Sequence, residues 1–306
     1  MENTSHESVT VGAVLGTFFP DGGKPIDEAD NGLFQVSLKW QNLAAVAQLA
    51  EVHGILAGMP LGYMAELLGR AAAAGEQLGL ALTAVRDAEV WHDIEPEHGQ
   101  ENRRAIAGRA LAESSGLWSI STGHAVANVV ARVVRGHSLS THLDKAFKWD
   151  GPPEPYGMSR YSNLSLNDGT VKALARAASA TAAPPLKSLV DPLVHLLESP
   201  AWAALTLRRD IGYHRWRPQS IEGGASTKSP WMYESRGTMS LSLGPSPGHV
   251  PPTVENLVAE SRAGHDALSS AMADILARLP EALKSVGVGI WKVDEDPTVP
   301  SAFETN

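Results

Sequence analysis

A short segment at residues 205–218 (LTLRRDIGYHRWRP) holds the residue types best suited to chemistry on a phosphate. Asp210 and His214 are four residues apart, so on a helix they share a face and the carboxylate can accept the imidazole N–H. That hydrogen bond fixes the tautomer of His214 and raises its basicity. Arg209 adds a planar guanidinium that fits phosphate oxygens. The pattern predicts cleavage of a phosphodiester without a metal, and in RNA the 2′-hydroxyl supplies the nucleophile.

The proposed chemistry requires that the Arg209 guanidinium and the His214 imidazole reach the same phosphate. Arg209 and His214 are five residues apart, which is about 140° around an ideal helix, so one regular helix does not aim both at one atom. A looser turn at Gly212, or a second copy of the segment across a two-fold axis, would bring them together. Four further side chains of the segment are predicted to contact the substrate: Arg208, Tyr213, Arg215 and Arg217.

Residues 209–214 (RDIGYH) resemble the Arg-x4–6-His motif of HEPN domains, in the form with a polar residue directly after the arginine. HEPN domains are all-α domains of nucleases found in toxin–antitoxin, abortive-infection and CRISPR systems, and in many of them the motif lies near a dimer interface. The resemblance covers about residues 170–286. It implies a homodimeric ribonuclease that acts as a toxin or in phage defence. In that reading Arg209 and His214 are catalytic and Asp210 supports them.

Other interpretations of the same residues remain open. Arginine and histidine near the C-terminal end of a helix are favoured by the helix dipole alone. The segment could therefore belong to a non-catalytic helical protein, in which it forms a dimer interface or binds a protein partner.

The remaining histidines are weaker candidates for a site. His92 and His98 lie close to Asp93, Glu95 and Glu97, but Pro96 prevents the continuous helix that would give fixed ligand spacing. His137 and His142 are too few for a closed metal site. No metal and no cofactor are predicted.

Three further histidines, His124, His195 and His265, lie among apolar residues of predicted helices. His124 and His265 are interpreted as hydrogen-bonded core histidines. If one of the three faced Arg209 and His214, the site would be larger than the motif.

Composition narrows the functional classes. The chain has 306 residues and a net charge of −9, which argues against a protein that coats nucleic acid but leaves room for a small cationic pocket. It has no cysteine, which fits a reducing cytoplasm and excludes disulfides and thiolate chemistry. No signal peptide and no membrane span are predicted, because the chain lacks a basic N-terminal region before an apolar run and any charge-free apolar stretch of about 20 residues.

The elements that must position these residues are predicted to be helices, which gives an all-α bundle of about seven helices. Residues 1–36 are predicted as a loop-rich segment, and residues 291–306 as an extended tail. The first helix is predicted to start at Leu38, and "ESSG" at residues 113–116 is a possible break. A helical part at residues 37–150 and a second at 165–290 are separated by a Pro/Gly-rich connector, unless residues 37–290 form one domain. A short hairpin is predicted near residues 230–243, and helices are predicted to begin near Asn167, at Pro200 and at Thr253.

Overall fold

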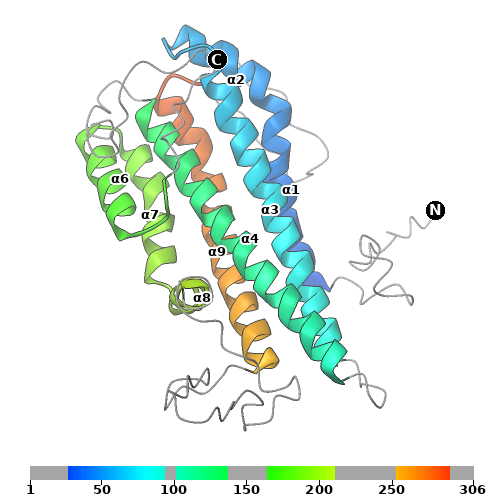
Figure 1. Ribbon diagram of the computed structural model, residues 1–306. Coiled ribbons are helices and arrows are strands. Elements are labelled where there is room, and N and C mark those ends of the chain that lie inside the picture. Colours follow the sequence, from blue (N-terminus) through cyan, green and yellow to red (C-terminus); the bar gives the residue numbers. More distant parts are fainter. Residues whose placement is uncertain (1–26, 94–100, 137–163, 211–252, 290–306) are drawn as a thin grey trace, which may run out of the picture.

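The computed structural model describes residues 27–93, 101–136, 164–210 and 253–289, and every regular element in these ranges is a helix (Figure 1). The prediction of an all-α bundle is therefore confirmed. The elements in chain order are α1 (Glu28–Gln41), the 3-10 helix η2 (Asn42–Val46), α2 (Ala47–Leu56), α3 (Tyr63–Asp93), α4 (Glu101–Arg135), α6 (Asp168–Ala180), α7 (Pro184–Glu198), α8 (Pro200–Asp210) and α9 (Val254–Ser285).

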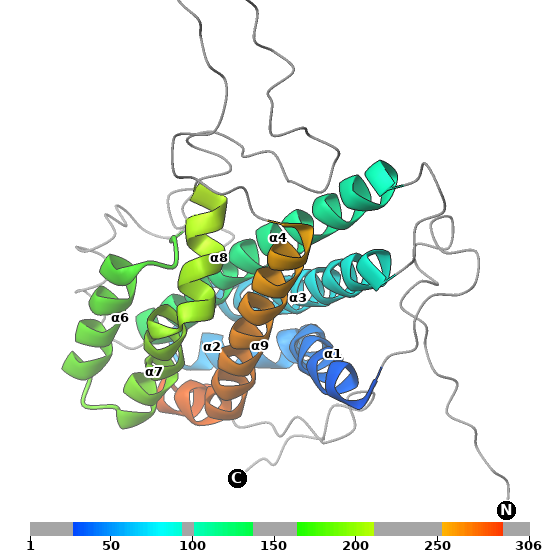
Figure 2. The ribbon, with the colours of Figure 1, turned by 90° about the horizontal axis from the view of Figure 1, so that it is seen from below.

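Three long helices, α3, α4 and α9, form the centre of the bundle (Figure 1). Viewed from below, α6 and α7 lie on one side of α9 and α1 lies on the other (Figure 2). Helix α2 lies at one end of the bundle, whereas α8 packs on α4, α7 and α9 away from that end. The larger of two hydrophobic clusters runs through these helices, from Trp40 in α1 to Val288 after α9, and the smaller one lies between α3, α4 and α9.

Helix α1 lies unusually close to α3 because α3 has glycines where the two helices meet. A Cβ atom on Gly75 would lie 2.6 Å from the Cβ of Trp40, and one on Gly79 would lie 2.7 Å from the Oγ of Ser37. Ser37 Oγ donates a hydrogen bond of 2.7 Å to the carbonyl oxygen of Gly75. The indole N–H of Trp40 donates to the carbonyl oxygen of Met272, at 3.1 Å. These contacts bind α1 to both α3 and α9.

The predicted helix starts are confirmed where a local signal marks them. Asn167 accepts a hydrogen bond from the N–H of Thr170, at 2.9 Å, at the start of α6. Thr253 accepts one from Asn256 at the start of α9, and α8 begins at Pro200. Helix α4 passes through residues 113–116 without a break.

The prediction of loop up to residue 36 was wrong for residues 28–36, which form most of α1. Asp27 caps this helix by accepting a hydrogen bond from the N–H of Asp30, at 2.8 Å. The helix predicted from Leu38 onward is also interrupted, because the chain forms η2 between α1 and α2.

Some predictions fall outside the described ranges: the hairpin near residues 230–243, the tail at 291–306 and most of the connector near 150–168. Within the described ranges no helix has a stretch both long enough and apolar enough to cross a bilayer.

Candidate functional site

Helix α8 carries the first arginines of the predicted site and is held tightly against α4 and α9. A Cβ on Gly123 of α4 would lie 2.7 Å from the indole ring of Trp202. A Cβ on Gly264 of α9 would lie 2.6 Å from Leu205, and one on Gly116 would lie 3.0 Å from the same leucine. Both Trp202 and Leu205 are buried. Because glycines let the backbones approach so closely, the position of α8 in the bundle is well defined.

Arg208, predicted to contact a substrate, is paired with a carboxylate of α9. Its Nε donates to Glu260 Oε2 at 2.8 Å, and its Nη2 donates to Oε1 at 2.6 Å. This is the bidentate geometry that guanidinium and carboxylate groups favour. The pair fastens the last turn of α8 to α9, so Arg208 already has a structural task.

Arg209 lies on the same turn and is half-buried. Its positive charge affects the pKa of a histidine of α4, His124. Burial lowers the pKa of His124, and the positive charge of Arg209 lowers it further. The structure thus brings one of the three helix histidines within electrostatic range of Arg209.

His124 has a structural role in this arrangement. Its Nδ1 accepts a hydrogen bond of 2.9 Å from the N–H of Leu166, just before α6. In the neutral ring the proton therefore sits on Nε2, and the lone pair of Nδ1 is already engaged. His124 cannot accept a proton at Nδ1 without losing this bond, so it fixes the entry to α6 and is a poor general base.

Most of the other predicted site residues lie outside the described ranges. Asp210 is the last residue of α8, and its side chain is not described. Tyr213, His214, Arg215 and Arg217 lie outside the described ranges.

The other two helix histidines, His265 and His195, differ in burial. His265 is fully buried, with Nε2 3.3 Å from the carbonyl oxygen of Leu78 and Nδ1 3.3 Å from the carboxylate of Asp266, as expected for a core histidine. His195 is exposed on the last turn of α7, although its sequence neighbours are apolar. Among the described residues no three potential ligands are grouped so that they could hold a metal ion.

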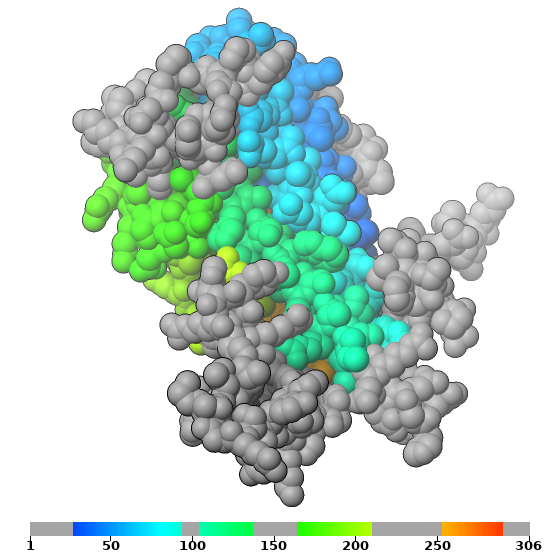
Figure 3. Space-filling model, viewed as in Figure 1, coloured from blue at the N-terminus to red at the C-terminus, as the bar shows by residue number. Residues whose placement is uncertain are grey.

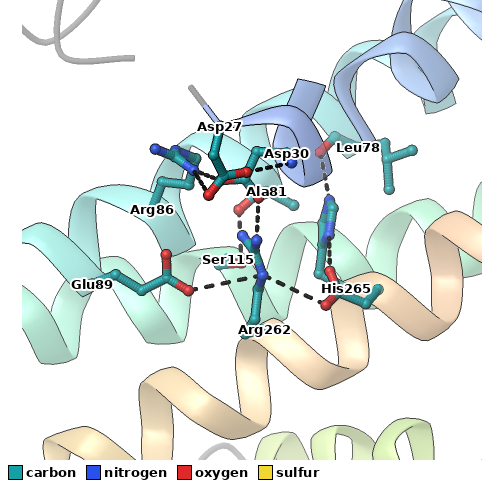
Figure 4. A network of polar contacts seen from close by, with 10 residues as sticks. Asp27, Asp30, Leu78, Ala81, Arg86, Glu89, Ser115, Arg262 and His265 are labelled. Carbon is teal, nitrogen blue, oxygen red and sulfur yellow. Dashed lines mark hydrogen bonds and ion pairs between the residues drawn. The ribbon is translucent and has the colours of Figure 1, made fainter. Parts of the chain in front are cut away.

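A buried charge network, missed at the level of sequence, joins three helices (Figure 4). The carboxylate of Asp30 in α1 contacts Arg86 of α3 and accepts a hydrogen bond from Arg262 of α9. The Nε of Arg262 also lies 3.8 Å from Glu89 and 3.5 Å from Asp266. No sequence signal points to this pairing, because its partners are far apart along the chain.

Next to the network, Asp87 is buried at a neighbouring position of α3. Burial raises the pKa of Asp87 to about 6, and the positive charge of Arg86 opposes that shift. Its Oδ2 atom has no hydrogen-bond partner among the described residues. Asp87 therefore holds its proton up to about pH 6, and above that pH the protein carries a buried carboxylate, which is costly.

An open cavity of about 450 Å³ adjoins the network between the end of α3 and the first half of α9. The residues that line it are Glu89, His92, Asp93, Glu255, Val258, Ala259, Arg262, Ala263 and Asp266. Its carboxylates outnumber its single arginine, so the cavity is unsuited to a phosphate.

Comparison with known proteins adds no assignment. No family model, no curated protein and no solved structure matches the chain.

Proposed function

We propose that the protein is a metal-independent endoribonuclease whose site lies where α8 ends. Arg209 holds the scissile phosphate, His214 is the general base, and Asp210 orients His214. A cytoplasmic toxin or a phage-defence effector is the cellular role that fits this activity. The observation that supports the proposal most is the position of Arg209, on the last turn of a helix that is anchored by glycine contacts and by the Arg208–Glu260 pair.

The proposed reaction needs few protein groups. His214 takes the proton of the 2′-hydroxyl, the 2′-oxygen attacks the adjacent phosphorus, and the bond to the 5′-oxygen breaks as that oxygen takes up a proton. The products are a 2′,3′-cyclic phosphate and a free 5′-hydroxyl. Arg209 stabilises the negative charge that builds up on the phosphoryl oxygens. An anchored α8 supports this role, because a guanidinium held in place before substrate arrives needs no reorganisation during the reaction.

The surrounding charge limits how RNA could bind. The nearby cavity of α3 and α9 is acidic, and the whole chain carries a net charge of −9. Phosphate contacts would therefore come from the arginine-rich segment itself and would number only one or two. Binding of single-stranded RNA should then weaken only slowly with salt, with a slope of log K against log[salt] of about −1.

The direct test is RNA cleavage by purified full-length protein in buffer containing EDTA. His214→Ala and Arg209→Ala should each lower the rate by about 10²- to 10⁴-fold, as expected for loss of a general base or a charge-stabilising group. His195→Ala is the matched control, because His195 is exposed on α7, and it should keep the wild-type rate. Equal rates for wild type and His214→Ala would overturn the proposal, and so would a wild type that cleaves no RNA.

A second candidate function is favoured by the Arg208–Glu260 pair, since it shows an arginine of this segment used for helix packing. In that case the segment forms a protein interface and has no catalytic role. Arg209→Ala should then change the mass of the complex in solution, and there should be no RNA cleavage to lose. Light scattering coupled to size-exclusion chromatography separates the two candidates.

A further inference from the structure

The outer face of α2 is apolar and exposed to a degree that is unusual for this bundle. Four of its side chains, Leu49, Val52, Ile55 and Leu56, are between 38% and 81% exposed, and Leu61 beyond the helix is 69% exposed. Leu49, Val52 and Leu56 recur at helical spacing and so lie on one face. The inner face of α2 instead buries Ala50 and Gly54, where a Cβ on Gly54 would lie 2.6 Å from Met64.

The acidic residue of α2 is turned away from this face. Glu51 accepts hydrogen bonds from the backbone N–H groups of Gly62, Met64 and Ala65, and so caps the start of α3. These bonds also hold the chain around Leu61 beside α2. The only other titratable side chain of α2 is His53. In η2, which directly precedes α2 in the chain, Ala44 and Ala45 are exposed and small.

We propose that this face is the contact between two copies of the chain, with α2 packed against α2 across a two-fold axis. Each copy carries a net charge of −9, so two copies repel one another across most surfaces. A face without free charge adds no close like-charge contact to that repulsion, and a two-fold contact requires a surface that is complementary to itself. An apolar helix face preceded by small alanines meets both conditions.

The size of the face fits a dimer contact of modest strength. The five side chains expose on the order of 500 Å² in each copy, so two copies would bury on the order of 1,000 Å², close to the lower limit for a specific interface. A patch of this size falls within the roughly 300–600 Å² of the largest apolar patch on a typical monomer, and such patches are often functional. Figure 3 shows the end of the molecule where this part of the chain, in blue, forms the surface.

This inference does not rest on the proposed ribonuclease activity. Helix α2 lies at one end of the bundle and α8 lies away from it (Figure 1). A dimer formed through α2 therefore keeps the two α8 helices apart, and loss of the dimer and loss of RNA cleavage can be measured separately.

The first test is the mass of the full-length protein by sedimentation velocity over a range of concentrations. Wild type should approach twice 32.5 kDa, and Leu56→Asp should shift the dimer dissociation constant upward by at least about 100-fold, because symmetry places two carboxylates in one apolar contact. Ile106→Asp is the control, because Ile106 is 67% exposed on α4, outside both α2 and the α8 segment, and it should stay dimeric. Circular dichroism should show all three proteins equally helical.

The second test uses the absence of cysteine from the chain. Val52→Cys should be captured as a covalent dimer by a short bis-maleimide, whereas Ile106→Cys should not. A wild type that is monomeric at every concentration overturns the proposal, even if another protein binds the face. A Leu56→Asp variant as dimeric as wild type overturns it too.

Discussion

Replacing Asp30 tests whether the buried charge network holds α1 to the bundle. The Asp30 side chain is 1% exposed, Arg86 is 3% exposed and Arg262 is 22% exposed. Asp30→Ala removes the carboxylate that lies between the two guanidiniums. Arg86 then keeps Asp27, an exposed carboxylate 3.8 Å from it, and Arg262 can turn further toward Glu89 and Asp266.

Most of the lost unfolding free energy should come from Arg86, whose charge stays buried after Asp30 is removed. Removing one partner of a buried ion pair typically costs about 3–5 kcal/mol, because the other charge stays buried. Since Asp27 remains nearby and Arg262 is partly solvated, we expect a loss at the lower end, about 3 kcal/mol of unfolding free energy. Against a total stability of about 5–15 kcal/mol, a loss of that size is easily measured.

Urea denaturation followed by circular dichroism measures this loss directly. A double-mutant cycle of Asp30→Leu, Arg86→Leu and the combined variant isolates the pair, and the combined variant should lose less than either single one, because neither member of the pair is left buried without the other. Lys172→Ala breaks an exposed pair with Asp168 and should change stability by less than about 0.5 kcal/mol. Single changes at Asp30 and Arg86 that each cost under about 1 kcal/mol and simply add would refute the reasoning.

Three further changes test other parts of the structure. Because burial raises the pKa of Asp87 to about 6 from 3.8, the stability linked to this group is complete below pH 4 and is lost as the pH rises through 6. Asp87→Asn should remove that dependence and make the protein about 3 kcal/mol more stable at pH 8, measured by urea denaturation at pH 4.5 and pH 8. A variant that is less stable at pH 8 would contradict this. Gly123→Ala should cost about 1–3 kcal/mol and change the tryptophan fluorescence, because its Cβ would meet Trp202, whereas Gly69→Ala has open space and should stabilise α3. Glu51→Ala should lower the melting temperature, by the equivalent of about 1–2 kcal/mol, since three backbone N–H groups at the start of α3 lose their acceptor. An unchanged melting temperature would exclude this capping role.

Helix starts that depend on neighbouring residues were predictable from the sequence, and the first helix was not. Asn167 and Thr253 cap their helices through bonds to residues only three positions away. Residues 27–32 (DEADNG) are also typical of turns, so their local preference is ambiguous. What holds α1 in place is contact with distant partners, such as the bond from Trp40 to Met272, and such partners cannot be read from spacing.

At the candidate site, too, the sequence predicted the residue types but not their tertiary partners. The sequence places Arg208 and Arg209 side by side, but it does not reveal that Arg208 pairs with Glu260, 52 residues away. It also does not reveal that His124 comes under the charge of Arg209. A local sequence pattern can therefore suggest which residues could take part in a reaction. Which role each of two adjacent arginines has depends on their tertiary contacts.

The glycines at the α8 contacts give a reason to regard its last turn as a fixed structural feature. Gly123 and Gly264 let Trp202 and Leu205 approach α4 and α9 more closely than a Cβ on either glycine would allow. Moving α8 outward would expose both side chains and open the Arg208–Glu260 pair at the same time. These costs act together, so the turn that carries Arg209 keeps its position unless a partner compensates for all of them. Either proposed role of this turn, phosphate binding or protein contact, would then begin from a preorganised guanidinium.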